Sequence, residues 1–252
     1  MARSKALAAL FLPDYRGVKP ESIYLKTCWT LASGNRHGKR VVLFSPGFGA
    51  GVFDYGPVVR SMERDSVILR VHHPGSARAS FLQALAIFTR ARFQGQKAAQ
   101  AARKARLWIH REENRRRRVE QLREVFLWAK ARYPEKSVVL AGHSFGTDTA
   151  LLGALAFAVD RLILLSPHPP GYLIEAGRYS RLSCPVSVLV GSEDWTRDGV
   201  GPQDRLKVVE ALPASTDSTV LAGVRHMDFA FSGLGPVGWE SHLQHALGQG
   251  CR

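Results

Sequence analysis

The sequence predicts an α/β fold in which a mostly parallel sheet is covered by helices on both faces. Buried-strand patterns alternate along the chain with helical patterns, an order typical of such sheets. The chain has 252 residues and is 45% hydrophobic, which is enough for one substantial core. We therefore expect a single domain over residues 1–252, without internal repeats or low-complexity segments.

The predicted strands are short apolar runs that end in glycine, proline or polar residues. The first, Ser22–Ala32, alternates between apolar and polar residues and predicts an exposed antiparallel strand or a hairpin. The later runs are continuously apolar, as expected for strands that are buried on both faces. They span Arg40–Gly47, Ser66–Gly75, Val138–Ala141, Asp160–Pro167, Pro185–Asp194 and Ser218–His226.

Helical patterns fill the intervals between these strands. The longest covers about Ser80–Arg132, with a break expected near Gly95, and others begin at Thr147 or cover Arg205–Leu212 and Val237–Leu247. The polar and glycine-rich motifs fall where predicted strands end. Because ligand sites of parallel sheets gather at the carboxyl ends of the strands, we expect the functional site at that edge.

The formal net charge of +14 is concentrated in one basic helical segment within residues 80–132. Between Arg90 and Arg118 there are eleven Lys or Arg residues against two acids, which raises a nucleic-acid interpretation. The segment also carries apolar residues at helical spacing, so we expect a buried apolar stripe with the arginines mainly on the solvated face. The stripe would contain Leu107, Ile109, Val119, Leu122, Val125, Phe126 and Ala129.

No RNA-recognition, KH or helix-turn-helix signature accompanies this basic segment, so the sequence argues against nucleic acid as a partner. We expect instead an exposed basic helix that attracts anionic substrates or surfaces, covers a pocket or contacts a partner. A nucleic-acid function would predict salt-dependent binding of polyanions that survives loss of Ser144. The oligomeric state is not predicted.

The three cysteines, Cys28, Cys184 and Cys251, are too scattered for a disulfide framework or for a metal cluster with close ligand spacing. They are typical of free thiols in a reducing compartment. We expect neither a metal ion nor another cofactor.

The N-terminal region resembles a secretion signal only in part. Arg3 and Lys5 precede an apolar run, Ala6–Leu12, which is at the lower length limit for a signal sequence, and Pro13 ends it without a cleavage site. We expect a cytoplasmic protein, with secretion as the minor alternative. No segment approaches the length of a membrane span.

The motif "GHSFG" at 142–146 places Ser144 between a predicted strand and a predicted helix. A sharp strand-to-helix turn needs glycine where a Cβ would collide, which explains Gly142 and Gly146, and it projects the serine hydroxyl outward. The alternative is a hydroxyl in an ordinary glycine-rich loop. The strand-turn-helix context favours a nucleophile.

A serine nucleophile needs a base to take its proton and a carboxylate to orient that base. Asp194 follows a buried strand and is the predicted acid, with Glu193 and Asp198 as neighbouring alternatives. His226 follows the last predicted strand and is the predicted base. His143 lies inside the turn, and the remaining candidates His72, His73 and His168 are expected to line the pocket or shape turns.

The oxyanion that forms during acyl transfer needs donors that are already in place. We predict the backbone amides of Phe48, in the glycine-rich loop after the Arg40–Gly47 strand, and of Phe145, directly after the serine. A simple tight turn also explains Gly47, Gly49 and Gly51. The glycines do not follow the dinucleotide-binding or P-loop patterns.

The motifs "FSPGFGAG", "HHPGS", "GHSFG", "GSEDW" and "VRHMDF" together resemble the α/β-hydrolase superfamily, from Arg40 to Phe229. Within it the chain is similar to serine esterases of the dienelactone-hydrolase-like, cutinase-like and platelet-activating-factor-acetylhydrolase-like groups. The resemblance implies the α/β-hydrolase fold. It also gives Ser144, Asp194 and His226 the roles of a catalytic triad, and Phe48 and Phe145 those of the oxyanion hole. The chain departs from the pattern at Pro46, where many relatives have histidine, and at Thr147-Asp148, where glycine or alanine is common.

The resemblance also guides the expected pocket and substrate. Only the short run Ser166–Cys184 separates two strands where related enzymes often carry a lid, so we expect no large cap there. Candidate substrate-binding residues are Gly47, His143, Tyr172 and Trp195, with Leu173 and Ile174 as further contacts. Apolar Phe48, Phe145 and Trp195 suggest a modest acyl pocket.

These observations predict a serine esterase that cleaves a short-chain ester or lactone through an acyl-enzyme on Ser144. One alternative is an acyltransferase or thioesterase that uses the same triad on a specialised substrate. A second is a non-catalytic binding protein that has kept the fold.

Overall fold

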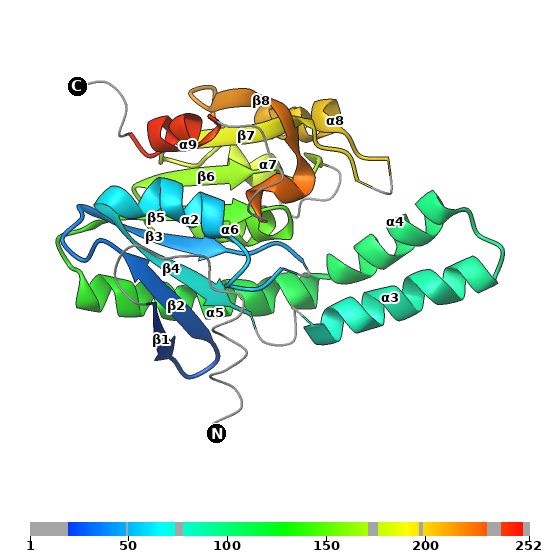
Figure 1. Ribbon diagram of the computed structural model, residues 1–252, viewed down its shortest axis with the longest axis horizontal. Helices are drawn as coiled ribbons and strands as arrows, with labels where there is room; N and C mark the ends of the chain where they lie inside the picture. Colours follow the sequence, from blue (N-terminus) through cyan, green and yellow to red (C-terminus); the bar gives the residue numbers. More distant parts are fainter. Residues whose placement is uncertain are drawn as a thin grey trace.

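The computed structural model describes residues 20–48, 50–73, 78–170, 176–196, 199–230 and 238–248. Its centre is an eight-stranded sheet with the strand order β1-β2-β4-β3-β5-β6-β7-β8 (Figure 1). The strands are β1 Glu21–Tyr24, β2 Trp29–Gly34, β3 Arg40–Ser45, β4 Ser66–His72, β5 Ser137–His143, β6 Arg161–Leu165, β7 Val186–Glu193 and β8 Asp217–Arg225.

The sheet is mostly parallel, as predicted. From β4 through β3 and on to β8, each strand pairs in parallel with the next, whereas β1 and β2 form an antiparallel hairpin that pairs with β4. The alternating run at Ser22–Ala32 is therefore a hairpin. The carboxyl ends of β3 to β8 share one edge of the sheet, and this edge positions the candidate site.

Helices cover both faces of the sheet. They are α2 Gly56–Met62, α3 Arg78–Phe93, α4 Ala98–Ile109, α5 Glu112–Arg132, α6 Phe145–Ala156, α7 Ala176–Tyr179, α8 Pro202–Leu206 and α9 Glu240–Ala246, with short 3₁₀ turns at Glu63–Asp65, Lys207–Ala211 and His226–Phe229. The predicted region Ser80–Arg132 breaks near Gly95 and again at His110–Arg111, which the sequence did not indicate. α2 was not predicted either. It begins at Gly56 with Pro57, whose fixed φ suits the first helical turn.

Alternation along β3 divides the core into two clusters. Val41 and Leu43 point to the face covered by α5 and α6, where they join Leu122 and Leu151. The opposite cluster contains residues of β3, α2 and α9, among them Val42, Phe44, Val59 and Leu243. Burial on both faces explains why the central strands are continuously apolar.

The basic segment differs from its prediction in two respects. Arg116 and Arg117 are exposed as expected, but Arg115 and Arg118 are buried on the side of α5 that faces the body. Leu107 is exposed and does not belong to a buried stripe.

The connection from β6 to β7 covers residues 166–185 and contains the one-turn helix α7, so it is too short for a large cap. Among the described residues, no helix is both long enough and apolar enough to cross a membrane.

Candidate active site

Ser144 occupies a strained turn between β5 and α6. Its φ is 52° and its ψ is −120°, a conformation that L-residues rarely adopt. A Cβ on Gly142 would lie 2.3 Å from the Gly146 carbonyl oxygen, and one on Gly146 would lie 1.8 Å from that of Ser45. Both glycines are therefore required for the turn, as predicted, because any side chain would collide with backbone.

Ser144, His226 and Asp194 form a continuous hydrogen-bonded chain. The Oγ of Ser144 lies 3.1 Å from Nε2 of His226, and the Nδ1 of His226 lies 2.7 Å from Oδ1 of Asp194. The three side chains come from the ends of β5, β8 and β7. The structure thus brings together the three residues that the sequence selected. Glu193 is exposed, and Asp198 lies outside the described residues.

Asp194 is buried, and two residues besides His226 contact its carboxylate. Ser166 donates a hydrogen bond to its Oδ2, and the Nε of Arg205 lies 2.9 Å from its Oδ1. Burial alone would raise the pKa of Asp194, but the hydrogen bond from His226 and the charges of His226 and Arg205 outweigh burial and hold it at about 2. Asp194 is therefore ionised at neutral pH and acts as the acceptor for His226.

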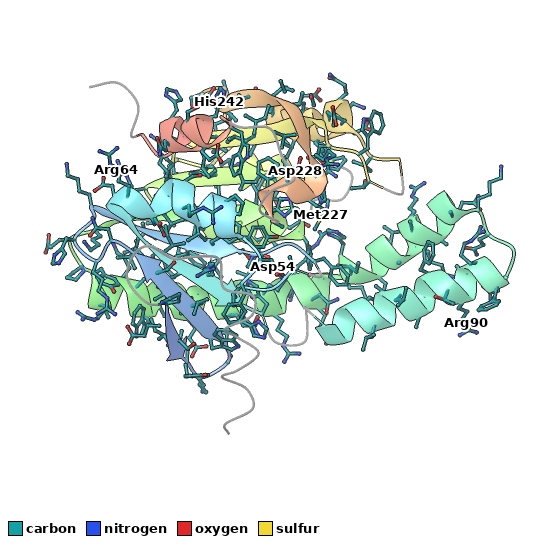
Figure 2. The ribbon with its side chains drawn as sticks, viewed as in Figure 1. Asp54, Arg64, Arg90, Met227, Asp228 and His242 are labelled. Carbon is teal, nitrogen blue, oxygen red and sulfur yellow. The ribbon has the colours of Figure 1, made fainter. Side chains whose placement is uncertain are left out.

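The loop that carries His226 is fixed locally by Asp228. The backbone N–H of Arg225 donates to Oδ2 of Asp228 at 2.8 Å, which closes the short turn His226–Phe229. Figure 2 labels Met227 and Asp228, the two residues that follow His226. Asp228 is buried and Met227 is partly exposed beside the histidine.

A second hydrogen-bonded chain runs from the glycine-rich loop to the His226 loop. The Gly47 N–H donates to Tyr55 Oη at 2.8 Å, Tyr55 Oη lies 2.9 Å from His143 Nδ1, and His143 Nε2 lies 2.9 Å from the His226 carbonyl oxygen. Because a carbonyl only accepts, Nε2 of His143 carries the proton and Nδ1 accepts from the tyrosine hydroxyl. Burial raises the pKa of Tyr55 and, with the nearby His226, lowers that of His143 well below its usual value. The tyrosine is thus protonated and His143 is neutral.

Arg118 links the glycine-rich loop to the nucleophile helix. Its Nη2 donates to the Pro46 carbonyl oxygen at 2.6 Å, and its Nε donates to Thr149 Oγ1 at 2.9 Å. The guanidinium also lies 4.6 Å from the centre of the Phe145 ring. Burial lowers the pKa of Arg118 to about 10, so the side chain remains charged at neutral pH.

His110, Asp148 and His168 form a buried group close to the nucleophile helix. The Nδ1 of His110 lies 2.9 Å from Oδ2 of Asp148, and the Nδ1 of His168 lies 3.0 Å from Oδ1. Three such ligands within a few ångströms could hold a metal ion. However, Nη2 of Arg115 lies 3.4 Å from Oδ2 of Asp148, and its positive charge opposes a cation there. We interpret the group as an ion-pair network that ties α6 to the start of α5.

Two of the predicted substrate-binding residues have internal roles instead. His143 is 1% exposed, and both its ring nitrogens are bonded within the protein, so it is not placed to contact a substrate. The N–H of Gly47 is bonded to Tyr55. Trp195 is largely exposed next to Asp194, as a contact residue would be, whereas Tyr172, Leu173 and Ile174 lie outside the described residues.

The two predicted oxyanion residues lie in different segments. Phe145 is the first residue of α6, where the helical N–H groups have no partner within the helix, and Phe48 lies in the loop after β3. The ring of Phe145 is buried against His110 and Arg118, so it does not form a pocket wall. The role of the backbone amides of Phe48 and Phe145 as oxyanion donors stays a prediction.

Sequence reasoning missed four residues that hold the site: Tyr55, Arg118, Ser166 and Arg205. One sequence signal was available for Ser166, which is a polar residue directly after the apolar run of β6. In the structure its φ is 50°. Arg118 is one of four consecutive arginines, and Arg205 lies in a short helix, so neither stands out.

No protein-family model and no curated protein matches the chain. Solved structures do match. They include an α/β serine hydrolase homologue from Coxiella burnetii, with 16% identity over 86% of this chain and 92% of that chain, at a TM-score of 0.60. A lidless α/β serine hydrolase from Xanthomonas campestris has 17% identity over 95% and 96%, also at 0.60. Dienelactone hydrolase from Anabaena variabilis has 15% identity over 91% and 96%, again at 0.60.

The likeness to these structures extends over most of each chain and agrees with the open, mostly parallel sheet and the helices on both its faces. The chain therefore has the α/β-hydrolase fold. At these identities the likeness concerns the fold alone, and an activity has to be inferred from the residues of the site itself.

Proposed function

We propose that the chain is a serine hydrolase that cleaves a carboxylic ester, either a short-chain ester or a lactone. The observation that carries the proposal is the unbroken chain from Ser144 through His226 to the ionised Asp194, with distances of 3.1 and 2.7 Å. This arrangement activates a hydroxyl that is otherwise a poor nucleophile. The exposed apolar side chains of Trp195 and Met227, next to the acid and the base, favour an uncharged acyl or alcohol group as ligand.

In the first half of the reaction, Ser144 Oγ attacks the ester carbonyl while Nε2 of His226 takes its proton. Asp194 orients the ring through Nδ1 and stabilises the resulting imidazolium. The carbonyl oxygen becomes an oxyanion, which the amides of Phe48 and Phe145 are proposed to bind. The tetrahedral species then collapses, the C–O bond to the alcohol breaks, and His226 returns its proton to that alcohol.

In the second half, water attacks the acyl-enzyme. His226 removes a proton from the water, a second tetrahedral species forms, and the bond to Ser144 Oγ breaks as the serine regains its proton. The products are a carboxylic acid and the free enzyme. A lactone gives one hydroxy acid by the same steps.

The test is release of p-nitrophenol from acetyl, butyryl and octanoyl esters by the native chain and by Ser144→Ala. Ser241→Ala is the matched control, because Ser241 is exposed and donates to the Gly238 carbonyl oxygen, within the same short turn. We expect turnover by the native chain and the control, fastest with the shorter esters, and none above background for Ser144→Ala. Equal turnover by Ser144→Ala would refute the proposal.

A further inference from the structure

Helices α3 and α4 form a hairpin that projects beyond the sheet, on the side to which the parallel strands point (Figure 1). We call residues 78–109 the α3–α4 hairpin. The two helices pack along each other. Among the hairpin side chains that the structure describes, the buried ones are Ala84, Ala91, Ala101 and Ala105. The most deeply buried side chains described in the hairpin are therefore small, whereas the larger Ile87, Phe88, Trp108 and Ile109 are half-buried.

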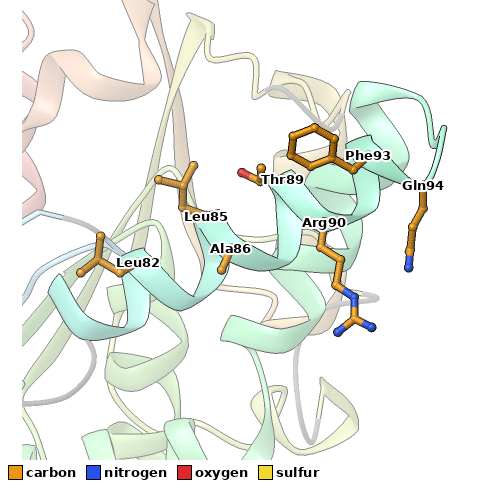
Figure 3. A pocket seen from close by; sticks show the side chains of 7 residues that line it. All are labelled: Leu82, Leu85, Ala86, Thr89, Arg90, Phe93 and Gln94. Atoms are coloured by element: carbon orange, nitrogen blue, oxygen red, sulfur yellow. The ribbon is translucent and has the colours of Figure 1, made fainter.

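Several of the larger apolar side chains of the hairpin face outward. Leu82 is 63% exposed and Phe93 is 87% exposed, and Leu85 of α3 and Leu107 of α4 are exposed as well. Leu82, Leu85, Thr89 and Phe93 follow helical spacing and lie along one side of α3, where they line a shallow open groove of about 610 Å³ (Figure 3). Exposed leucine and phenylalanine gathered on one element indicate a contact surface.

The charge of the hairpin is entirely positive. From Arg78 to Arg111 the sequence contains no aspartate or glutamate. The exposed cationic side chains described there are Arg90, Arg92, Lys97, Arg103, Lys104 and Arg111. A second copy of the hairpin would be repelled, so the complementary partner is anionic.

We propose that the α3–α4 hairpin is a docking surface for an anionic lipid bilayer. A bilayer interface takes up leucine and phenylalanine side chains while its phosphates attract arginine and lysine, and this surface offers both groups together. Nucleic acid would also complement the positive charge of the hairpin, but its binding would leave Leu82, Leu85 and Phe93 exposed to water. The hairpin would lie in the headgroup region rather than cross the membrane.

The hairpin is attached to the edge of the sheet that carries the candidate site. It follows the carboxyl end of β4, and directly after it His110 is hydrogen-bonded to Asp148, one turn beyond Ser144 on α6. Docking would therefore hold this edge near the bilayer. The proposal concerns binding and does not depend on the hydrolase activity.

The test is co-sedimentation of the full chain with vesicles of phosphatidylcholine alone or mixed with phosphatidylglycerol. The apolar variant is Leu85→Ser with Phe93→Ser, and its matched control is Leu127→Ser, since Leu127 is 56% exposed on α5 outside the hairpin. The charge variant is Arg90→Gln with Arg92→Gln. Its matched control is Arg116→Gln with Arg123→Gln, which changes two exposed arginines of α5 outside the hairpin. Turnover of a short p-nitrophenyl ester measures the hydrolase activity separately, with Ser144→Ala as the inactive reference.

We expect binding to the anionic vesicles and not to phosphatidylcholine alone. Affinity should fall about tenfold or more in both hairpin variants and stay unchanged in both controls and in Ser144→Ala. Turnover of the soluble ester should persist in the hairpin variants. Equal binding to both vesicle types, or unchanged binding by the apolar variant, would overturn the proposal, as would binding to RNA or heparin that is tighter than vesicle binding and unaffected by the apolar variant.

Discussion

The Nε2 atom of His143 lies 2.9 Å from the carbonyl oxygen of His226. His143 directly precedes the candidate nucleophile, so this bond joins the strand that carries Ser144 to the loop that carries its partner. The other side of the ring is bonded to Tyr55, which also accepts from Gly47. One buried neutral histidine thus fixes the spacing between the candidate nucleophile, base and oxyanion loop.

Replacing Tyr55 with phenylalanine should loosen this arrangement. Tyr55→Phe removes the acceptor for the Gly47 N–H and the donor to His143 Nδ1, and leaving buried polar groups unpaired costs about 1–3 kcal/mol. We expect the free energy of unfolding to fall by about that amount, and kcat to fall about tenfold with a smaller change in KM. Urea unfolding and ester hydrolysis measure the two effects. Tyr24→Phe, at an exposed position, should change neither.

Replacing Arg118 with lysine should lower activity even though the positive charge is kept. Lysine presents one donor group and cannot reach the Pro46 carbonyl oxygen and Thr149 Oγ1 together, so the oxyanion loop would shift relative to α6. We expect kcat/KM of Arg118→Lys to fall about 10- to 100-fold, while Arg117→Lys, at the exposed neighbour, keeps native activity. Similar losses in both variants would show that the buried contacts of Arg118 do not position the site.

Changing the carboxylate of Asp194 to an amide should abolish most activity without removing the side chain. The amide no longer stabilises the imidazolium and allows the wrong tautomer of His226, which costs about 10⁴-fold in kcat in comparable triads. Asp204→Asn is the control, because the Asp204 side chain is 42% exposed and pairs with Lys207 at the surface. The ester assay should separate the two variants, and circular dichroism should confirm that both are folded. Near-native kcat in Asp194→Asn would contradict the assigned role.

The stability of the protein should decrease as the pH falls below about 6.5. Burial holds the pKa of His73 and of His143 well below that value, whereas the unfolded chain binds their protons at about 6.5. Below pH 6.5 the unfolded state therefore binds more protons and is favoured, by up to about 1.4 kcal/mol per pH unit for each histidine. Above pH 6.5 neither histidine contributes to the pH dependence.

Urea unfolding at about pH 7.5 and about pH 5.5 measures this slope. The two values lie about one unit above and below the pKa of histidine in the unfolded chain. The variant His73→Gln removes one titrating group that is hydrogen-bonded to Ser45 and Gln121. Its slope should be shallower than that of the native chain. An unchanged slope in His73→Gln would show that this histidine is not buried in its neutral form.

The fold and the three central residues could be predicted because their signals are local. Ser144, Asp194 and His226 each directly follow or end a strand, so the parallel sheet brings them to one edge. Which of the four arginines from Arg115 to Arg118 are buried could not be predicted. It depends on the rotation of α5 against the sheet, which turns Arg115 and Arg118 inward and Arg116 and Arg117 outward.

The outward face of the α3–α4 hairpin could not be predicted for a related reason. Leucine, phenylalanine and alanine all count as apolar in a sequence pattern, and periodicity alone assigns the larger side chains to the core. In the structure the hairpin buries Ala91 and Ala101 and exposes Leu82 and Phe93. Which side chains are buried depends on how closely the two helices approach each other. The sequence pattern carries no information on that distance.

The most direct test of the central claim is peptide mapping by mass spectrometry after reaction with a fluorophosphonate probe. The Oγ of Ser144 has a base 3.1 Å away, so it should attack the phosphorus centre, displace fluoride and retain the probe. We predict one label, on the peptide that contains Ser144, together with loss of ester turnover and no labelling of Ser144→Ala. Turnover that persists while Ser144 remains unlabelled would contradict the account.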